Sequence, residues 1–243
     1  AVITLNRPPV NALNGELIGD IEAAVARASD DTIRAVVITG NRHFAAGADI
    51  TRFVDAFDGD GAEPQASGLA ATVRQLEQLQ KPVIAAIPGY ALGGGLELAM
   101  GADFRYLADD AKVGQPEILL GIIPGAGGTQ RLQRLIGYQA AKELNLSGRH
   151  DAADEALALG IADKVVPAAE LLDVAKADAA RWAEGATKAY AADKQAMGEG
   201  FGRPIDEAME VETNAFNACF ATADAKAGIL AFVSKEKADF TGK

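Results

Sequence analysis

Two glutamates stand in sequence surroundings that differ from those of an ordinary surface carboxylate. Glu97 follows the glycines at 93–95 and has apolar neighbours, whereas Glu117 ends the segment 114–117 (GQPE) and precedes three apolar residues. Because an unpaired carboxylate among apolar side chains loses its hydration, such a group is either paired or functional. Two carboxylates of this kind could hold a water molecule and transfer protons. Each alone also fits a plainer interpretation, as a helix-start or loop carboxylate.

Two turns rich in small residues could bind a substrate oxygen. Residues 44–49 (FAAGAD) and 89–97 (GYALGGGLE) each follow an apolar, strand-like segment. Small residues let a ligand approach the backbone, and the start of a helix offers unpaired N–H groups. If the turns converge, two N–H groups form an oxyanion hole, which stabilises negative charge on a substrate oxygen. Each turn taken singly fits a plain tight turn equally well.

A third glycine-rich segment, residues 123–131 (IPGAGGTQR), leads into a helix and could bind an anion or a polar substrate group. Its residues 125–130 lack the third glycine of a dinucleotide-binding fingerprint. This segment is therefore not a dinucleotide-binding fingerprint.

Other catalytic side chains are scarce. His43 and His150 are too isolated for a metal site, so no metal is predicted, and both fit surface or local hydrogen-bonding roles. Cys219 lies in a helical pattern between Ala218 and Phe220 and fits a core position. No serine stands in a Gly-x-Ser-x-Gly elbow. Acid–base chemistry therefore falls to the carboxylates.

Composition narrows the classes of partner. The net charge of −11 repels phosphate backbones, so we expect no nucleic-acid partner. No apolar run reaches the length of a membrane span, so no membrane partner is expected either. A single cysteine excludes an intrachain disulfide and fits a reducing compartment, which favours a cytoplasmic location. The chain opens at Ala1 in strand-like sequence, so we expect further residues upstream, where any targeting segment would lie.

Alternating strands and helices must position the candidate residues. Apolar and β-branched runs predict strands, and apolar residues at helical spacing predict helices. The expected strands are 1–5, 33–39, 83–87, 104–107 and 111–113, and the expected helices are 17–28, 69–79 and 96–100, with a loop at 55–68. After residue 126 helical patterns dominate, at about 127–135, 138–146, 152–159, 168–184, 187–199, 205–221 and 224–236, with 161–166 as the one strand-like interruption. This order predicts an α/β front followed by a helical tail.

Across essentially its whole length the chain resembles the crotonase family, also called the enoyl-CoA hydratase/isomerase superfamily. The ordered set of motifs carries the resemblance more strongly than any one motif. The matching segments are residues 5–8 (LNRP), 11–13 (NAL), 44–50 (FAAGADI), 81–86 (KPVIAA), 90–95 (YALGGG), 114–117 (GQPE), 124–132 (PGAGGTQRL), 154–156 (DEA), 159–161 (LGI) and the ending 231–240.

The resemblance implies a crotonase-like ββα superhelix with a helical C-terminal trimerisation region. It implies an α/β spiral core over 1–185, and an oligomerisation region over 186–243 that forms a homotrimer or a hexamer built as a dimer of trimers. Among relatives, the likeness is closest to enoyl-CoA hydratases. These enzymes add water in syn geometry to a trans-2-enoyl-CoA, giving 3-hydroxyacyl-CoA in fatty-acid β-oxidation. The partner would be an acyl-CoA thioester, with no separate cofactor because the substrate itself carries coenzyme A.

The family pattern also implies roles for individual residues. Glu97 and Glu117 match the two catalytic glutamates of true hydratases, with Glu117 as the principal acid–base group and Glu97 orienting or activating the water. Ala48 and Gly94 would donate the oxyanion-hole N–H groups. The implied water- or substrate-binding residues are Gly125 and Gln115, and the candidate coenzyme-A contacts are Ala46, Asp49, Ile50, Arg7, Arg52, Lys235 and Lys237.

Alternatives remain open at this point. A family isomerase, which moves a double bond, could use one glutamate alone. A third hypothesis is a non-catalytic relative that binds coenzyme A or RNA, and the net charge of −11 argues against RNA. The chain departs from many relatives where Thr51 precedes Arg52 and where Pro88 precedes Gly89. Acyl-chain length cannot be read from loop 55–68.

Overall fold

A parallel five-stranded sheet organises the first part of the chain. The computed structural model describes residues 1–51 and 66–243, and it places the strands in the order β1-β2-β3-β5-β8. These strands are β1 (Val2–Leu5), β2 (Val36–Gly40), β3 (Val83–Ile87), β5 (Phe104–Ala108) and β8 (Lys164–Val166). Every residue of β2 and β3 is buried, as expected for central parallel strands that are covered on both faces.

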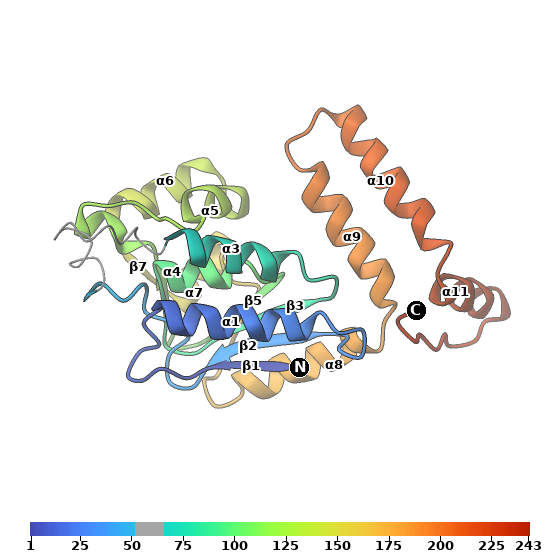
Figure 1. The fold of residues 1–243 in the computed structure, drawn as a ribbon, viewed down its shortest axis with the longest axis horizontal. Helices are drawn as coiled ribbons and strands as arrows, with labels where there is room; N and C mark the ends of the chain where they lie inside the picture. The colour runs from blue at the N-terminus through green and yellow to red at the C-terminus, as the bar shows by residue number, and fades with distance from the viewer. Residues whose placement is uncertain (52–65) are drawn as a thin grey trace.

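Helices supply that cover. α1 (Gly15–Ala28) packs against α3 (Ala66–Glu77), while α8 (Leu171–Ala183) packs against β2, β3 and β5 (Figure 1). Asn14 caps α1 by accepting a hydrogen bond from the N–H of Leu17 at 3.0 Å. Leu17, Ile21 and Val25 then recur at helical spacing and are buried, so the amphipathic pattern of the sequence is confirmed.

A second sheet of three short strands lies beside the candidate residues. It contains β4 (Tyr90–Leu92), β6 (Lys112–Gly114) and β7 (His150–Ala152), in that order. β4 leads into α4 (Gly94–Ala99), and β6 leads into the 3₁₀ helix η1 (Pro116–Leu120). The expectation that 161–166 is the only strand-like segment after residue 126 is wrong, because β7 pairs antiparallel with β6. A strand of three residues is too short to show an alternating pattern.

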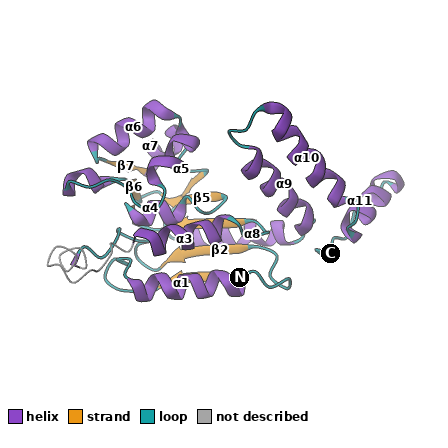
Figure 2. Cartoon of the chain, turned by 45° about the horizontal axis from the view of Figure 1, so that its top comes forward, coloured by secondary structure: helices purple, strands orange, loops and turns teal. Residues whose placement is uncertain are grey.

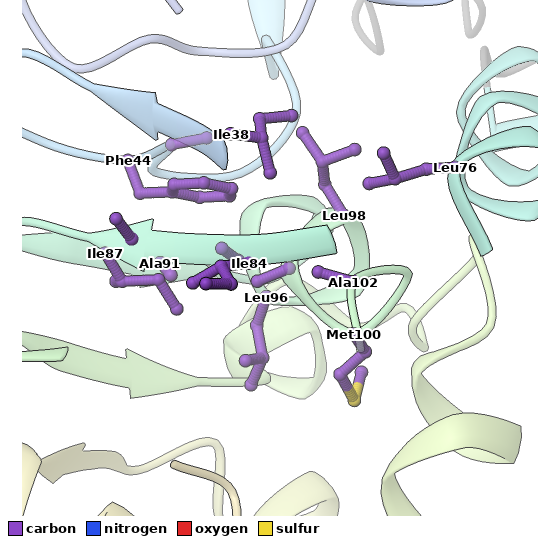
Figure 3. Close-up of a cluster of buried hydrophobic side chains, with 14 of the residues drawn as sticks. Ile38, Phe44, Leu76, Ile84, Ile87, Ala91, Leu96, Leu98, Met100 and Ala102 are labelled. Atoms are coloured by element: carbon purple, nitrogen blue, oxygen red, sulfur yellow. The ribbon is translucent and has the colours of Figure 1, made fainter. Parts of the chain in front are cut away.

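Part of the hydrophobic core packs around the small-residue turns. Figure 3 shows Phe44 beside Ile38, with Ile87, Leu96 and Leu98 in the same cluster. All five of these residues are fully buried. Because protein interiors are close-packed, this cluster fixes the backbone positions of two turns. Phe44 begins the turn 44–49, and Leu96 follows the glycines at 93–95.

The rest of the chain is helical, as the sequence predicts. The helices are α5 (Gly128–Ile136), α6 (Tyr138–Ser147), α7 (Ala153–Leu159), α9 (Thr187–Gly200), α10 (Ile205–Cys219) and α11 (Ala223–Ser234). Figures 1 and 2 show α9, α10 and α11 as an arm that extends away from the sheets. The arm begins two residues after position 185, and the division into 1–185 and 186–243 stays a prediction.

Two basic side chains anchor the start of this arm. Lys194 on α9 donates to the Asp103 carboxylate at 2.8 Å and to the Lys81 carbonyl at 3.0 Å. Arg34 donates to the Thr187 hydroxyl at 3.0 Å and to the carbonyl of Phe240 at 2.9 Å. These contacts join the arm and the end of the chain to the sheet body.

Much of the arm's apolar surface is exposed. The large apolar side chains exposed there are Met197, Phe201, Ile205, Met209, Phe216, Phe220, Ile229, Leu230, Phe232 and Val233. Cys219, expected in the core, is only partly buried, because α10 has no buried residue in a single chain. Within residues 1–51 and 66–243, no single helix is long and apolar enough to cross a membrane, and α10 with α11 passes that test only as a pair bent by 79°.

Candidate active site

The turn that carries Ala48 is held from both sides by backbone hydrogen bonds. Ala45 bridges to Ala91 of β4, and Ala48 bridges to Leu13 in the loop before α1. The N–H of Leu13 donates to Gly47 at 2.8 Å, and the N–H of Asp49 donates back to Leu13 at 2.8 Å. The intervening N–H of Ala48 has no acceptor among the described residues, so this part of the chain leaves it available to a ligand.

The glycines at 93–95 bring the second turn against the first. A Cβ atom built on Gly95 would lie 2.0 Å from the Ala45 carbonyl, so only glycine permits this approach. A Cβ built on Gly94 would lie 3.7 Å from the Ala48 nitrogen and 2.9 Å from Leu69 Cδ2. Gly94 is also the first residue of α4, where backbone N–H groups lack helical partners.

The two turns thus converge as the sequence suggests they could. In the described part of the chain, neither Ala48 nor Gly94 donates its N–H to a protein acceptor. The side chains of Leu13 and Leu69 also lie beside Gly94, at 3.4 Å and 2.9 Å from a Cβ atom built on that residue. Two unpaired donors beside apolar side chains can bind an oxygen that gains negative charge.

Glu97 lies one turn into α4 and is 3% exposed. Its Oε1 accepts hydrogen bonds from the N–H groups of Ala126 and Gly128, both at 2.7 Å. Burial raises the pKa of Glu97, while the N–H groups of Gly128 and Ala126 and the charge of Arg131 oppose that rise. The start of α5 therefore acts as an anion-binding turn for a buried carboxylate.

Glu117 is held differently, in the 3₁₀ helix η1, and is partly exposed. The buried amide of Gln115 donates to both carboxylate oxygens, at 2.9 and 3.1 Å, in the amide orientation that satisfies both groups. Burial, together with the nearby charge of Glu97, raises the pKa of Glu117 to about 7. At neutral pH this carboxyl group can therefore both give and accept a proton.

The two carboxylates lie in one shared site. A Cβ on Gly93 would lie 2.9 Å from Glu117 Oε1, and Gly93 has a φ of 52°, which favours glycine. A Cβ on Gly128 would lie 2.8 Å from the Gln115 side-chain amide, at the amide atom that faces away from Glu117, so the turn that binds Glu97 lies beside the amide that binds Glu117. Two carboxyl groups in different environments suit a division into base and acid.

The candidate coenzyme-A contacts fall into separate groups. Ala46, Asp49 and Ile50 share the Ala48 turn, and Ile50 is 49% exposed. Arg7 donates to the Asp49 carboxylate at 2.7 Å and to the Ala12 carbonyl at 2.8 Å, so its charge is paired within the chain. Hydrogen bonds from Thr51 and then Arg7 lower the pKa of Asp49.

Lys235 and Lys237 lie apart from the site in a single chain. Arg52 lies outside the described residues. Lys235 directly follows α11, and both views place α11 at the end of the molecule away from α4 (Figures 1 and 2). Lys237 lies two residues further along. Gly125, by contrast, immediately precedes Ala126 in the turn that binds Glu97 and is exposed.

The sequence did not reveal every residue that shapes the site. Arg131 donates to the carbonyl of Ala126, and Leu13 and Leu69 lie against Gly94. In the sequence, only the position of Arg131 about one helical turn after Gly127 and Gly128 could have indicated its contact with this turn. His43, expected at the surface or in a local hydrogen bond, is partly buried: its ring stacks on that of Tyr90 with centroids 4.5 Å apart, and its buried Nδ1 has no hydrogen-bond partner among the described residues.

No group of three or more His, Cys, Asp or Glu side chains within the described ranges could hold a metal ion.

Comparison with known proteins identifies the family. The enoyl-CoA hydratase/isomerase family model matches residues 1–243. A crotonyl-CoA hydratase of Syntrophomonas wolfei is 45% identical over 100% of this chain and 95% of its own length. A short-chain-enoyl-CoA hydratase of Clostridium acetobutylicum is 42% identical over 98% of this chain and 92% of its own.

Solved structures agree with this result. The crystal structure of an enoyl-CoA hydratase from Geobacillus kaustophilus has a TM-score of 0.92 and is 32% identical, covering 100% of this chain and 93% of that one. One from Bacillus anthracis has a TM-score of 0.91 and is 35% identical, covering 100% and 95%. The crotonase-like fold expected from the sequence is confirmed. The chain belongs to the enoyl-CoA hydratase/isomerase family.

Proposed function

We propose that this protein is a hydro-lyase that adds water to a short-chain trans-2-enoyl-CoA and forms the 3-hydroxyacyl-CoA. The observation that carries the proposal is that Glu97 and Glu117 share one site beside two N–H groups that have no acceptor among the described residues. Relatives named for crotonyl-CoA and for short-chain enoyl-CoA support the substrate class. An acyl-CoA thioester carries its own activating group, so the reaction needs no further cofactor.

The N–H groups of Ala48 and Gly94 would bind the thioester carbonyl oxygen. When water attacks the β-carbon, electrons move through the double bond and negative charge collects on this oxygen as an enolate. Preorganised donors stabilise that charge more than they stabilise the neutral carbonyl. Removing one such donor typically costs about 10²–10³ in rate.

Glu97 and Glu117 would divide the proton transfers. The N–H groups of Ala126 and Gly128 favour the ionised form of Glu97, which takes a proton from the attacking water. Glu117, with its pKa of about 7, supplies the proton that the α-carbon receives. The C–O bond forms at the β-carbon, the C–H bond forms at the α-carbon, and the elements of one water molecule are added.

Turnover of crotonyl-CoA by the purified chain tests this proposal. Loss of the conjugated enoyl-thioester absorbance reports hydration, and Glu117→Gln should lower kcat at least about 100-fold. Glu22→Gln, at an exposed position of α1, is the matched control and should leave the rate unchanged. Near-normal hydration by Glu117→Gln would overturn the proposal. Faster turnover of a 3-enoyl-CoA than of a 2-enoyl-CoA would instead establish an isomerase.

Residues 186–243 would mediate assembly into a homotrimer, or into a hexamer of two trimers. The exposed apolar side chains of α9, α10 and α11 support this, since soluble monomers rarely expose large contiguous apolar patches. Lys235 and Lys237 would then contact coenzyme A only in the assembly. Sedimentation of the intact chain would reveal the subunit number. A cytoplasmic location and a place in β-oxidation stay predictions.

A further inference from the structure

We propose that Arg131 is a positioning residue that locks the backbone turn 126–128 in the geometry that holds the Glu97 carboxylate. This inference rests on the proposed function, because the turn matters catalytically only if Glu97 does. Arg131 lies on α5 and touches the far side of the turn rather than the carboxylate itself.

The guanidinium group contacts two elements at once. Its Nη1 donates to the carbonyl oxygen of Ala126 at 3.1 Å. Its Nη2 and Nε donate to Oε2 and Oε1 of Glu77 at 2.8 and 3.3 Å, and Glu77 is the last residue of α3. The planar fork of arginine suits such paired contacts with a carboxylate. The Arg131 side chain is 19% exposed and that of Glu77 is 45% exposed.

The contact to Ala126 fixes the peptide groups that face Glu97. The N–H of Ala126 donates to Glu97 while its carbonyl accepts from Arg131, so this residue is held from opposite sides. Gly127 has a φ of 113°, which only glycine adopts readily, and its missing Cβ leaves room for the guanidinium. The N–H of Arg131 also donates to the Gly127 carbonyl at 2.7 Å.

The same arrangement places a positive charge behind the carboxylate. Among the described residues, the charged groups around Glu97 are Arg131 from α5, Glu117 from η1 and, behind Arg131, Glu77 from α3. Burial raises the pKa of Glu97, and Arg131 lowers it along with the N–H groups of the turn. Loss of Arg131 should therefore favour protonated Glu97 and shift the acid limb of the activity profile upward.

The test compares Arg131→Gln with Arg134→Gln, a change of the same type on the same helix. Arg134 hydrogen-bonds to Gln130 and does not contact the turn. We expect Arg131→Gln to lower kcat about tenfold with little change in KM, because it disturbs the geometry of Glu97 without removing a substrate contact. The acid limb should move up by about half a pH unit or more. Arg134→Gln should leave kcat and the acid limb unchanged.

Two further variants separate positioning from charge and from folding. Arg131→Lys keeps the charge and loses the fork, so kcat should fall while the acid limb moves less than in Arg131→Gln. Glu77→Gln removes the anchor at a half-exposed position and should give a smaller fall of the same kind. A kcat and an acid limb that stay unchanged in both folded Arg131 variants would overturn the inference.

A measurement without turnover separates this inference from the proposed function. A carbon-13 NMR titration, with the Glu97 carboxyl signal assigned by its loss in Glu97→Gln, gives the pKa of that group directly. An upward shift in Arg131→Gln, absent in Arg134→Gln, supports the positioning role even if crotonyl-CoA is not hydrated. An unchanged Glu97 pKa in a folded Arg131→Gln chain contradicts it whether or not the chain is a hydratase.

Discussion

The turn around Glu97 and the short helix around Glu117 hold the same type of side chain in opposite ways. Glu97 is 3% exposed, and its carboxylate accepts two backbone N–H groups at 2.7 Å. Glu117 lies in a partly exposed 3₁₀ helix and receives one side-chain amide. Fixed backbone donors favour an anion, whereas burial with few donors favours the neutral acid. The difference shows how two glutamates can become a base and an acid at one pH.

The two regions also differ in what surrounds them. The Glu97 region is closed by core residues, and a Cβ on Gly94 would lie 2.9 Å from Leu69 Cδ2. The Glu117 region opens onto exposed apolar side chains, with Leu119 at 70% exposed and Ile123 at 68%. One side of the site is therefore packed among buried side chains of the described residues, while the other presents exposed apolar side chains.

The largest expected effect concerns a glycine on the closed side. Gly94→Ala should lower kcat about 100-fold or more, because its Cβ would displace either Leu69 or the N–H that lies beside Ala48. Gly121→Ala is the matched change on the open side. Gly121 has a φ of 74° with no neighbouring atom within 4 Å, so alanine there should cost about 1 kcal/mol of stability and little activity. Equal losses of kcat in Gly94→Ala and Gly121→Ala would contradict the difference drawn between the closed and the open side of the site.

The second prediction concerns the pH profile of kcat/KM. The proposed mechanism requires one proton on the pair, with Glu97 ionised and Glu117 protonated when hydration begins. Activity should therefore fall as pH drops far enough to protonate Glu97, and fall again as pH rises through the Glu117 pKa of about 7. Initial rates with crotonyl-CoA across the pH range measure both limbs. A flat profile from pH 6 to 9 would show that Glu117 does not act as a proton donor.

The smallest expected effect concerns stability. The pKa of Glu117 is raised from 4.5 to about 7 in the folded chain, so the folded state binds its proton more tightly than the unfolded state does. The stability linked to this proton is fully present below pH 4.5 and is lost as pH rises through 7. After allowance for partial exposure, we expect a loss of about 1 kcal/mol between pH 5 and 8. Urea unfolding should show that Glu117→Gln lacks this loss.

The sequence predicted most of the fold because the main signals are local. β-Branched runs marked β2 and β3, and apolar residues at helical spacing marked α1 and the later helices with errors of a few residues. The three-residue strands β4 and β7 gave no such signal, since their pairing depends on partners far along the chain. Leu79, expected in a helix, lies beyond the end of α3 at Glu77.

The candidate site was predictable in its residue types and not in its geometry. The glycines at 93–95 indicated close backbone approach, and the structure places Gly95 against Ala45 and Gly94 beside Ala48. Nothing local to Glu97 indicated that Ala126 and Gly128, about thirty residues later, would bind it. Likewise the pairing of Arg7 with Asp49 depends on the tertiary fold, and the sequence alone left both as candidates for coenzyme A.

The central claim is that Glu97 and Glu117 together add water across the enoyl double bond. The most direct test is turnover of crotonyl-CoA in water enriched in heavy oxygen, with mass spectrometry of the product. The account predicts 3-hydroxybutyryl-CoA that carries one heavy oxygen, formed by the unchanged chain and at least about 100 times more slowly by Glu117→Gln. Product without the heavy oxygen, or equal rates in the two chains, would contradict it.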